Sequence, residues 1–105
     1  MTKKFAVAAL VSACGMLTIG APAYANAELA KQKNCLACHA GDKKLVGPAY
    51  REIAAKYKAD KNAPAVLAKK IREGGVGVWG QIPMPANPQV NEQEAQTLAK
   101  WVLSM

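Results

Sequence analysis

The chain has 105 residues, with 14 lysines and arginines against 7 aspartates and glutamates, which gives a formal net charge of +7. That length allows one small domain and excludes a multidomain enzyme. Apolar residues make up 51% and charged residues 20%, a balance typical of a folded chain rather than a disordered one. Three cysteines are too few for a disulfide-rich scaffold. We therefore expect one compact module.

The first 25 residues have the pattern of a secretory signal peptide. Lys3 and Lys4 form a short basic start, an apolar stretch follows, and Ala23 and Ala25 supply the small side chains of a cleavage site. We predict cleavage after Ala25, which leaves a mature domain of residues 26–105 outside the cytoplasm.

Two other interpretations of this segment are weaker. A retained membrane anchor needs about 20 apolar residues, and Gly15, Gly20 and Pro22 interrupt the stretch here. A lipoprotein signal would place the lipid on Cys14 and leave apolar residues at the start of the mature chain. We therefore expect no stable membrane insertion.

Four helices are predicted from apolar side chains at helical spacing and from start and stop signals. The predicted segments are residues 28–40, a segment opened by Gly47-Pro48 that extends through Tyr57, residues 63–73 and residues 92–105. Asn62 and Asn91 have the side chains that favour N-caps, and Glu94 completes a capping-box pattern with Asn91. The fold class is therefore all-α, with one Gly- and Pro-rich loop over residues 74–90.

The motif that indicates chemistry is Cys-x-x-Cys-His at residues 35–39, the pattern of c-type haem attachment. Two thiols three residues apart on a helical turn face the same way and can add across the two vinyl groups of one haem. The adjacent His39 then reaches the iron as an axial ligand. The motif predicts one covalent haem c on Cys35 and Cys38.

Other uses of this motif lack a required companion. A zinc site needs further ligands, yet the predicted mature domain has no other cysteine or histidine. A thioredoxin-like pair expects a βαβ context, and a disulfide over so short a loop stabilises little.

The sixth iron ligand follows by elimination, because His39 is the only histidine. The candidates are Met84, Met105, a lysine, or an open position. Met105 is the terminal residue and continues the apolar face of the last helix, whereas Met84 lies between two prolines that restrict the backbone. We predict that Met84 ligates the iron, which raises the reduction potential and leaves no open position.

These ligands favour a carrier of single electrons. Two other classes stay open: a haem enzyme or gas sensor, which requires that Met84 does not ligate, and a haem-free thiol oxidoreductase using Cys35 and Cys38.

The chain resembles the small bacterial cytochrome c-551 group of class I cytochromes c. The resemblance rests on five segments in order, which are residues 35–39, 46–50, 77–80, 82–85 and 94–104. It implies about four helices around one covalent haem, in a soluble periplasmic protein. It also implies electron transfer to a haem nitrite reductase, a terminal oxidase or a peroxidase. The single small core and the lack of a spare apolar stripe favour a monomer.

The resemblance implies roles for residues near the haem. The Pro48 carbonyl accepts a hydrogen bond from the ring of the proximal histidine, Trp79 matches a propionate donor, and Asn87 matches an amide near the ligating sulfur. Lys70 stands where the family has a propionate-binding arginine, and lysine lacks the planar fork of arginine. Ala86 replaces a third proline, which makes the ligand loop less stiff.

Lysines near the motif predict how partners dock. Lys43 and Lys44 follow the haem-binding turn, and other lysines precede it and lie on the third predicted helix. A lysine-fringed haem edge suits brief, charge-steered docking on an acidic protein surface. Nucleic acid is excluded as a partner because the chain is exported.

Overall fold

The computed structural model describes residues 23–105. The predicted signal peptide lies outside the described residues except for its last three positions, with which α1 begins. The described elements are α1 (Ala23–Gln32), the short 3-10 helix η1 (Cys35–Ala37), α2 (Tyr50–Tyr57), α3 (Ala63–Glu73) and α4 (Glu92–Leu103). The described part of the chain contains helices and no β-strand, so the all-α prediction is confirmed.

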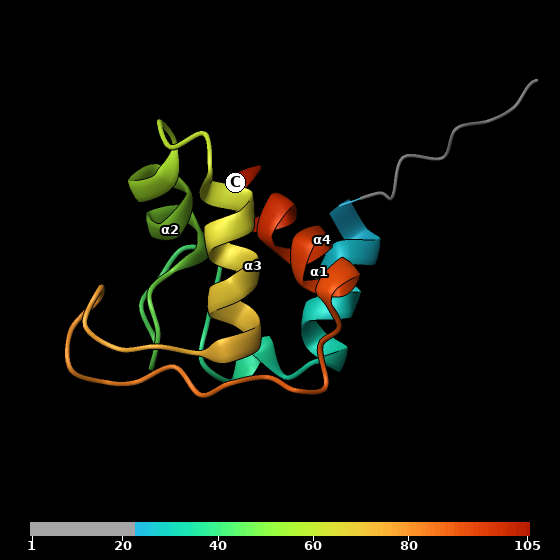
Figure 1. Cartoon of the computed structure of the whole chain (residues 1–105), viewed down its shortest axis with the longest axis horizontal. Coiled ribbons are helices and arrows are strands. Elements are labelled where there is room, and N and C mark those ends of the chain that lie inside the picture. Colours follow the sequence, from blue (N-terminus) through green and yellow to red (C-terminus); the bar gives the residue numbers. More distant parts are fainter. Residues whose placement is uncertain (1–22) are drawn as a thin grey trace, which may run out of the picture.

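Helix α4 is the centre of the packing. It contacts α1, α2 and α3, and Figure 1 shows it between α3 and α1. Its buried face carries two alanines, which let the neighbouring helices approach closely, and larger apolar side chains that fill the core. The buried residues of this face are Ala95, Leu98, Ala99, Trp101 and Val102.

The start of α4 has the predicted capping box. The side chain of Asn91 accepts a hydrogen bond from the Glu94 backbone N–H at 2.8 Å, and the Asn91 N–H donates to the Glu94 carboxylate at 3.1 Å. At the start of α3 the expected cap is absent, because the Asn62 side chain makes no capping bond. There the Asn62 N–H donates to the Asp60 carboxylate at 2.8 Å.

The predicted first helix over residues 28–40 was wrong in its extent. Helix α1 ends at Gln32, and Asn34 follows with φ 65°, in the left-handed region that asparagine tolerates better than most residues. A helix cannot continue through that conformation. The cysteines therefore lie on the separate turn η1 rather than inside an α-helix.

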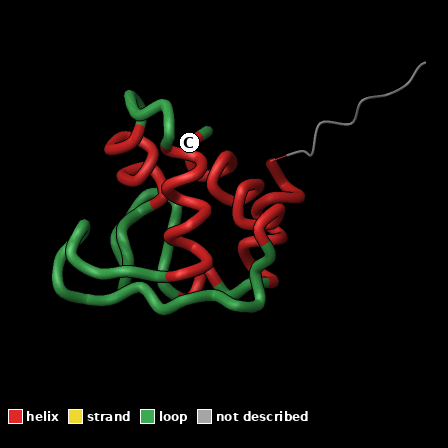
Figure 2. Tube along the Cα trace, in the orientation of Figure 1, coloured by secondary structure: helices red, strands yellow, loops and turns green. Residues whose placement is uncertain are grey.

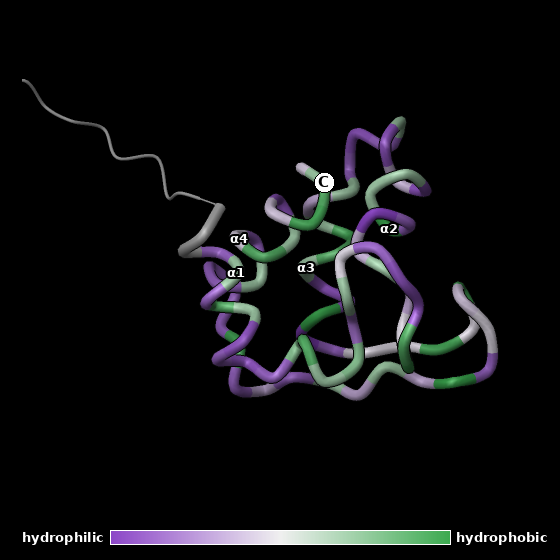
Figure 3. Tube along the Cα trace, turned by 180° about the vertical axis from the view of Figure 1, so that it is seen from behind, coloured by the Kyte–Doolittle hydropathy of each residue, from purple (hydrophilic) through white to green (hydrophobic). Residues whose placement is uncertain are grey.

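Two of the connecting segments lie at the same edge of the molecule. Figure 2 shows the loop between α3 and α4 running along the edge where the segment between η1 and α2 also lies. Figure 3 shows apolar stretches in the part of that long loop farthest from the helices. Apolar loop residues at the edge where the Cys-x-x-Cys-His segment lies indicate that this edge holds the functional site. None of the helices within residues 23–105 has the length and apolar character needed to span a membrane.

Candidate cofactor site

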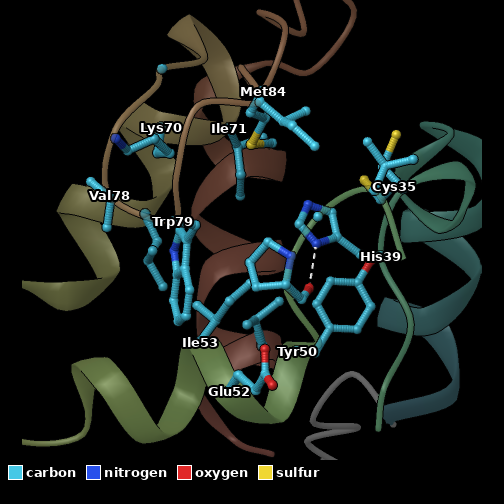
Figure 4. A pocket seen from close by; sticks show the side chains of 18 of the residues that line it. Cys35, His39, Tyr50, Glu52, Ile53, Lys70, Ile71, Val78, Trp79 and Met84 are labelled. Atoms are coloured by element: carbon cyan, nitrogen blue, oxygen red, sulfur yellow. Dashed lines mark hydrogen bonds between the residues drawn. The ribbon is translucent and has the colours of Figure 1, made fainter. Parts of the chain in front are cut away.

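A cavity of about 540 Å³ lies between the helices and the long loop. This volume is within the range of small-molecule and cofactor sites. The cavity is lined by the four residues that the sequence predicts to attach the haem or ligate its iron, and also by Trp79 and Lys70. Figure 4 shows Cys35, His39, Met84, Lys70 and Trp79 around the cavity, on different segments of the chain. The predicted residues are Cys35, Cys38, His39 and Met84.

The two cysteines are held by a tight backbone turn. The Cys38 N–H and the His39 N–H both donate to the Cys35 carbonyl, at 3.2 and 3.0 Å. Both thiols are free and partly exposed. Burial raises the pKa of the Cys35 thiol, with a smaller contribution from the nearby Cys38. A raised pKa disfavours the thiolate that a thiol oxidoreductase needs for attack.

His39 is oriented by its contact with Pro48. Nδ1 of His39 lies 2.7 Å from the Pro48 carbonyl oxygen. Because a carbonyl oxygen only accepts, this hydrogen bond requires the proton on Nδ1 and leaves the lone pair of Nε2 free to ligate a metal. The segment that carries Pro48 is itself tied back to the motif, since the Gly47 N–H donates to the Cys38 carbonyl at 2.7 Å.

Tyr50 also orients His39, and sequence reasoning assigned it only to the core. Its ring stacks on the imidazole with 5.4 Å between centroids and 23° between planes. Tyr50 also contacts Trp101 in an edge-on arrangement, with 5.1 Å between the ring centroids. Periodicity placed Tyr50 on a buried helix face but gave no sign that this face touches the histidine.

Met84 is held by a short antiparallel bridge with Gly75. The Met84 N–H donates to the Gly75 carbonyl at 2.8 Å, and the Gly75 N–H donates to the Met84 carbonyl at 3.0 Å. The chain enters this bridge through Gly74, whose φ of 73° favours glycine. The flanking prolines and this bridge together fix the backbone from which the half-buried Met84 side chain projects (Figure 4).

Asn87 ties the Met84 loop to the end of α3. Its Nδ2 donates to the carbonyls of Ile71 at 2.8 Å and Pro85 at 3.3 Å. Its Oδ1 accepts from the Gln89 side chain at 3.1 Å, which fixes the orientation of the amide. Both amide hydrogens therefore point to backbone carbonyls of the segments that flank the methionine.

Trp79 and Lys70 lie on the same side of the cavity (Figure 4). Trp79 keeps 42% of its surface exposed, and the Lys56 ammonium lies 5.4 Å from its ring centroid. Lys70 is half-buried, and a Cβ added at Gly75 would lie 2.9 Å from its Nζ. The cavity thus has one wall with an N–H donor and an ammonium group, in an otherwise largely apolar lining.

The match to known proteins decides what this cavity binds. The cytochrome c family pattern matches residues 24–105. The chain belongs to the cytochrome c family. It is 51% identical over 102 residues to cytochrome c-551 of Pseudomonas aeruginosa, covering 97% of each chain. It is 48% identical over 93 residues to cytochrome c-552 of Nitrosomonas europaea, covering 89% of this chain and 90% of that one.

A solved structure has the same fold. The crystal structure of wild-type Nitrosomonas europaea cytochrome c552 matches with a TM-score of 0.73 and 52% identity, over 74% of this chain and 96% of that one. The resemblance to class I cytochromes c drawn from the sequence is confirmed.

Family membership implies a covalently attached haem c, with Cys35 and Cys38 in the Cys-x-x-Cys-His positions. The residues present fit that group. Two free thiols lie at the wall of a largely apolar cavity, the ring of a histidine beside them is held through its Nδ1, and a thioether enters from the α3–α4 loop. The protein is accordingly an electron carrier that works with redox partners, not an enzyme.

Proposed function

We propose that His39 and Met84 are the two axial ligands of the haem iron. The observation that carries this proposal is that both side chains enter the cavity beside the two cysteines, from two separately braced segments. The Pro48 contact directs Nε2 of His39 away from the backbone, and the bridge with Gly75 holds the Met84 segment. His and Met ligation in a c-type cytochrome favours the ferrous form and so raises the potential.

The bound haem supplies a reversible one-electron couple at its iron. The chain determines what this couple can do. With His39 and Met84 on the iron, no position is open to oxygen or peroxide, and the apolar lining keeps water from the centre. The alternatives with an open iron or with a haem-free thiol pair have no observation of their own in their favour.

We further propose that the mature domain spans residues 26–105 and acts in the periplasm as a monomer. The export pattern of the first 25 residues supports this location. In that compartment the protein donates single electrons to a terminal reductase, such as a haem nitrite reductase, or to an oxidase or peroxidase.

Four further residues complete the proposed site. Pro48 orients His39, Asn87 fixes the Met84 loop, and Trp79 and Lys70 serve the haem propionates. The polar wall formed by Trp79 and Lys70 supports the last assignment, because propionates need donors in a cavity whose lining is mostly apolar.

Spectra of the purified ferric and ferrous protein test the ligand set. The expected result is a low-spin iron in both states, with one haem that stays on the chain after denaturation. High-spin ferric iron would favour the open-iron alternative, and a chain with two free thiols and no porphyrin, made in a cell able to attach haem, would refute the proposal.

A further inference from the structure

Tyr50 has a buried hydroxyl that the proposed function leaves without a role. The residue is only 5% exposed, and its phenol oxygen is the single buried side-chain nitrogen or oxygen in the described chain that lacks a hydrogen-bond partner. Buried polar groups are almost always paired, so an unpaired one indicates a strained site or a partner that belongs to the working protein. The aromatic neighbours of Tyr50 give it no acceptor.

The place of this hydroxyl is set by two aromatic contacts. The Tyr50 ring contacts His39, on which it stacks, and Trp101, which meets it edge-on. Tyr50 and Trp101 are both buried in the core, so the ring of Tyr50 cannot shift without displacing packed neighbours. Tyr50 is thereby pressed against a proposed iron ligand.

The hydroxyl lies on the side of the haem-attachment turn. Figure 4 shows the phenol oxygen beyond the His39 contact, toward Cys35. Cys35 packs against the same core cluster as Tyr50. A phenol hydroxyl donates hydrogen bonds, and the Cys35 sulfur is an acceptor on the same side of the ring.

The imidazole has a second neighbour that limits its movement. Gly47 approaches the ring so closely that a Cβ there would lie 2.5 Å from Cε1. The Pro48 carbonyl fixes the direction of Nδ1. A hydrogen bond at one ring atom does not stop the ring from rotating about that bond, whereas a stacked ring does. The stack of Tyr50 supplies the restraint that Pro48 cannot.

We propose that Tyr50 is a positioning residue of the haem site, whose ring sets the plane of the His39 imidazole and whose hydroxyl donates a hydrogen bond to the Cys35 sulfur once the haem is attached. This inference rests on the proposed ligation by His39. The sulfur is a weak acceptor in either the thiol or the thioether form. A donor at that sulfur withdraws electron density from the attached haem and so favours the ferrous state.

Two variants separate the ring from the hydroxyl. Tyr50→Phe keeps the stack and loses the donor, and Tyr50→Leu loses both. In the ferric protein, proton NMR shifts of the haem methyl groups report the orientation of the axial ligand planes. We expect Tyr50→Phe to keep the wild-type order of these shifts with a lower reduction potential, and Tyr50→Leu to change the order as well.

Tyr57→Phe is the matched control. It removes a phenol hydroxyl from the same helix at a half-buried residue that makes no stacking contact with His39. It should keep the wild-type order of methyl shifts, and its potential should lie above that of Tyr50→Phe.

The roles of the Tyr50 ring and of its hydroxyl are tested separately. An unchanged order of methyl shifts in Tyr50→Leu overturns the role of the ring, and an unchanged potential in Tyr50→Phe overturns the role of the hydroxyl. If Tyr50→Leu does not mature, nuclear Overhauser contacts between the Tyr50 and His39 rings in the ferrous wild type take its place, and their absence overturns the ring's role. Failure of the ligand proposal shows separately, because the wild-type protein would then lack the strongly shifted ring signals of an iron-bound histidine.

Discussion

A Cβ at Gly47 would lie 2.5 Å from Cε1 and 2.9 Å from Nδ1 of His39. The backbone of residue 47 therefore forms one wall of the space in which the imidazole lies. This contact explains why a glycine precedes the proline whose carbonyl takes the Nδ1 hydrogen bond. The residue that orients the histidine and the residue that makes room for it are neighbours in the chain.

Gly47→Ala should destabilise the protein, because the backbone or the imidazole must move to admit the methyl group. Overpacking of this kind costs about 1–3 kcal/mol. Denaturant unfolding of the holoprotein would measure the loss in the free energy of unfolding. Gly41→Ala is the control, since a Cβ at Gly41 meets nothing within 4 Å. Equal stability of both variants would contradict the close packing of Gly47 on His39.

Met84→Ala should leave haem attached through the two cysteines while opening the iron to added cyanide or carbon monoxide. The reduction potential should fall, because the thioether stabilises the ferrous state. Ligand titrations and potentiometry would measure both effects. Met105→Ala is the matched control, because Met105 lies exposed beyond the end of α4. A wild-type spectrum and potential in Met84→Ala would transfer the ligand role to Met105 or a lysine.

Asn87→Ala should loosen the Met84 loop. Loss of the two hydrogen bonds to the Ile71 and Pro85 carbonyls should lower the free energy of unfolding by about 1–2 kcal/mol. It should also speed the replacement of the methionine by an added ligand such as imidazole. Asn62→Ala, which removes an asparagine that makes no side-chain cap, should do neither. Equal replacement rates in the two variants would show that the Asn87 hydrogen bonds do not help to hold Met84 on the iron.

Helices α3 and α4 and the haem-attachment motif were predictable because each depends on local sequence. Spacing of apolar side chains gave both helices, and residues 35–39 gave the attachment chemistry. The end of α1 was missed because the sequence shows no stop signal there except Asn34, whose left-handed conformation is one option among several for asparagine.

The contacts of Tyr50 and Gln89 were not predictable for a different reason. Tyr50 meets His39 and Trp101 only after α2 and α4 pack together, so no local pattern reveals the stack. The Gln89 side chain donates to Oδ1 of Asn87 at 3.1 Å and to the backbone carbonyl of Lys33, which lies 56 positions earlier in the sequence, at 3.4 Å. Such pairings depend on the tertiary fold rather than on the composition of either segment.

Glu94 should make the stability depend on pH. Its hydrogen bond from the Asn91 backbone N–H, together with the Lys33 ammonium 3.3 Å away, lowers the pKa of its carboxyl group. The folded state favours the carboxylate, so Glu94 stabilises the protein at pH values above the pKa that its carboxyl group has in the unfolded chain. This stabilisation is lost as the pH falls through the pKa of the same group in the folded protein.

Denaturant unfolding of wild type and Glu94→Gln across the acid range would measure that contribution. The difference in the free energy of unfolding should shrink as the pH falls. Glu92→Gln, in the same helical turn, is the comparison for a carboxylate that makes no ion pair in the described chain. A difference independent of pH would mean that the glutamine loses packing rather than charge.

Docking on a redox partner should depend on charge at the loop edge of the molecule. Lys43 and Lys44 are exposed in the segment between η1 and α2, and Lys44 lines the haem cavity. An electron carrier must dissociate after each transfer, which suits a small contact steered by charge. The rate of association with an acidic reductase or oxidase should fall as salt rises, since the Debye length is about 8 Å at physiological ionic strength.

The pair Lys43→Glu and Lys44→Glu should slow association further without changing the haem spectrum. The pair Lys58→Glu and Lys61→Glu changes the net charge equally but lies in the α2–α3 connection, at the end of the molecule away from the loop edge (Figure 1), and should slow it much less. Stopped-flow oxidation across a salt series would measure all three proteins. A flat dependence on salt, or equal slowing by both pairs, would show that local charge at the loop edge does not guide docking.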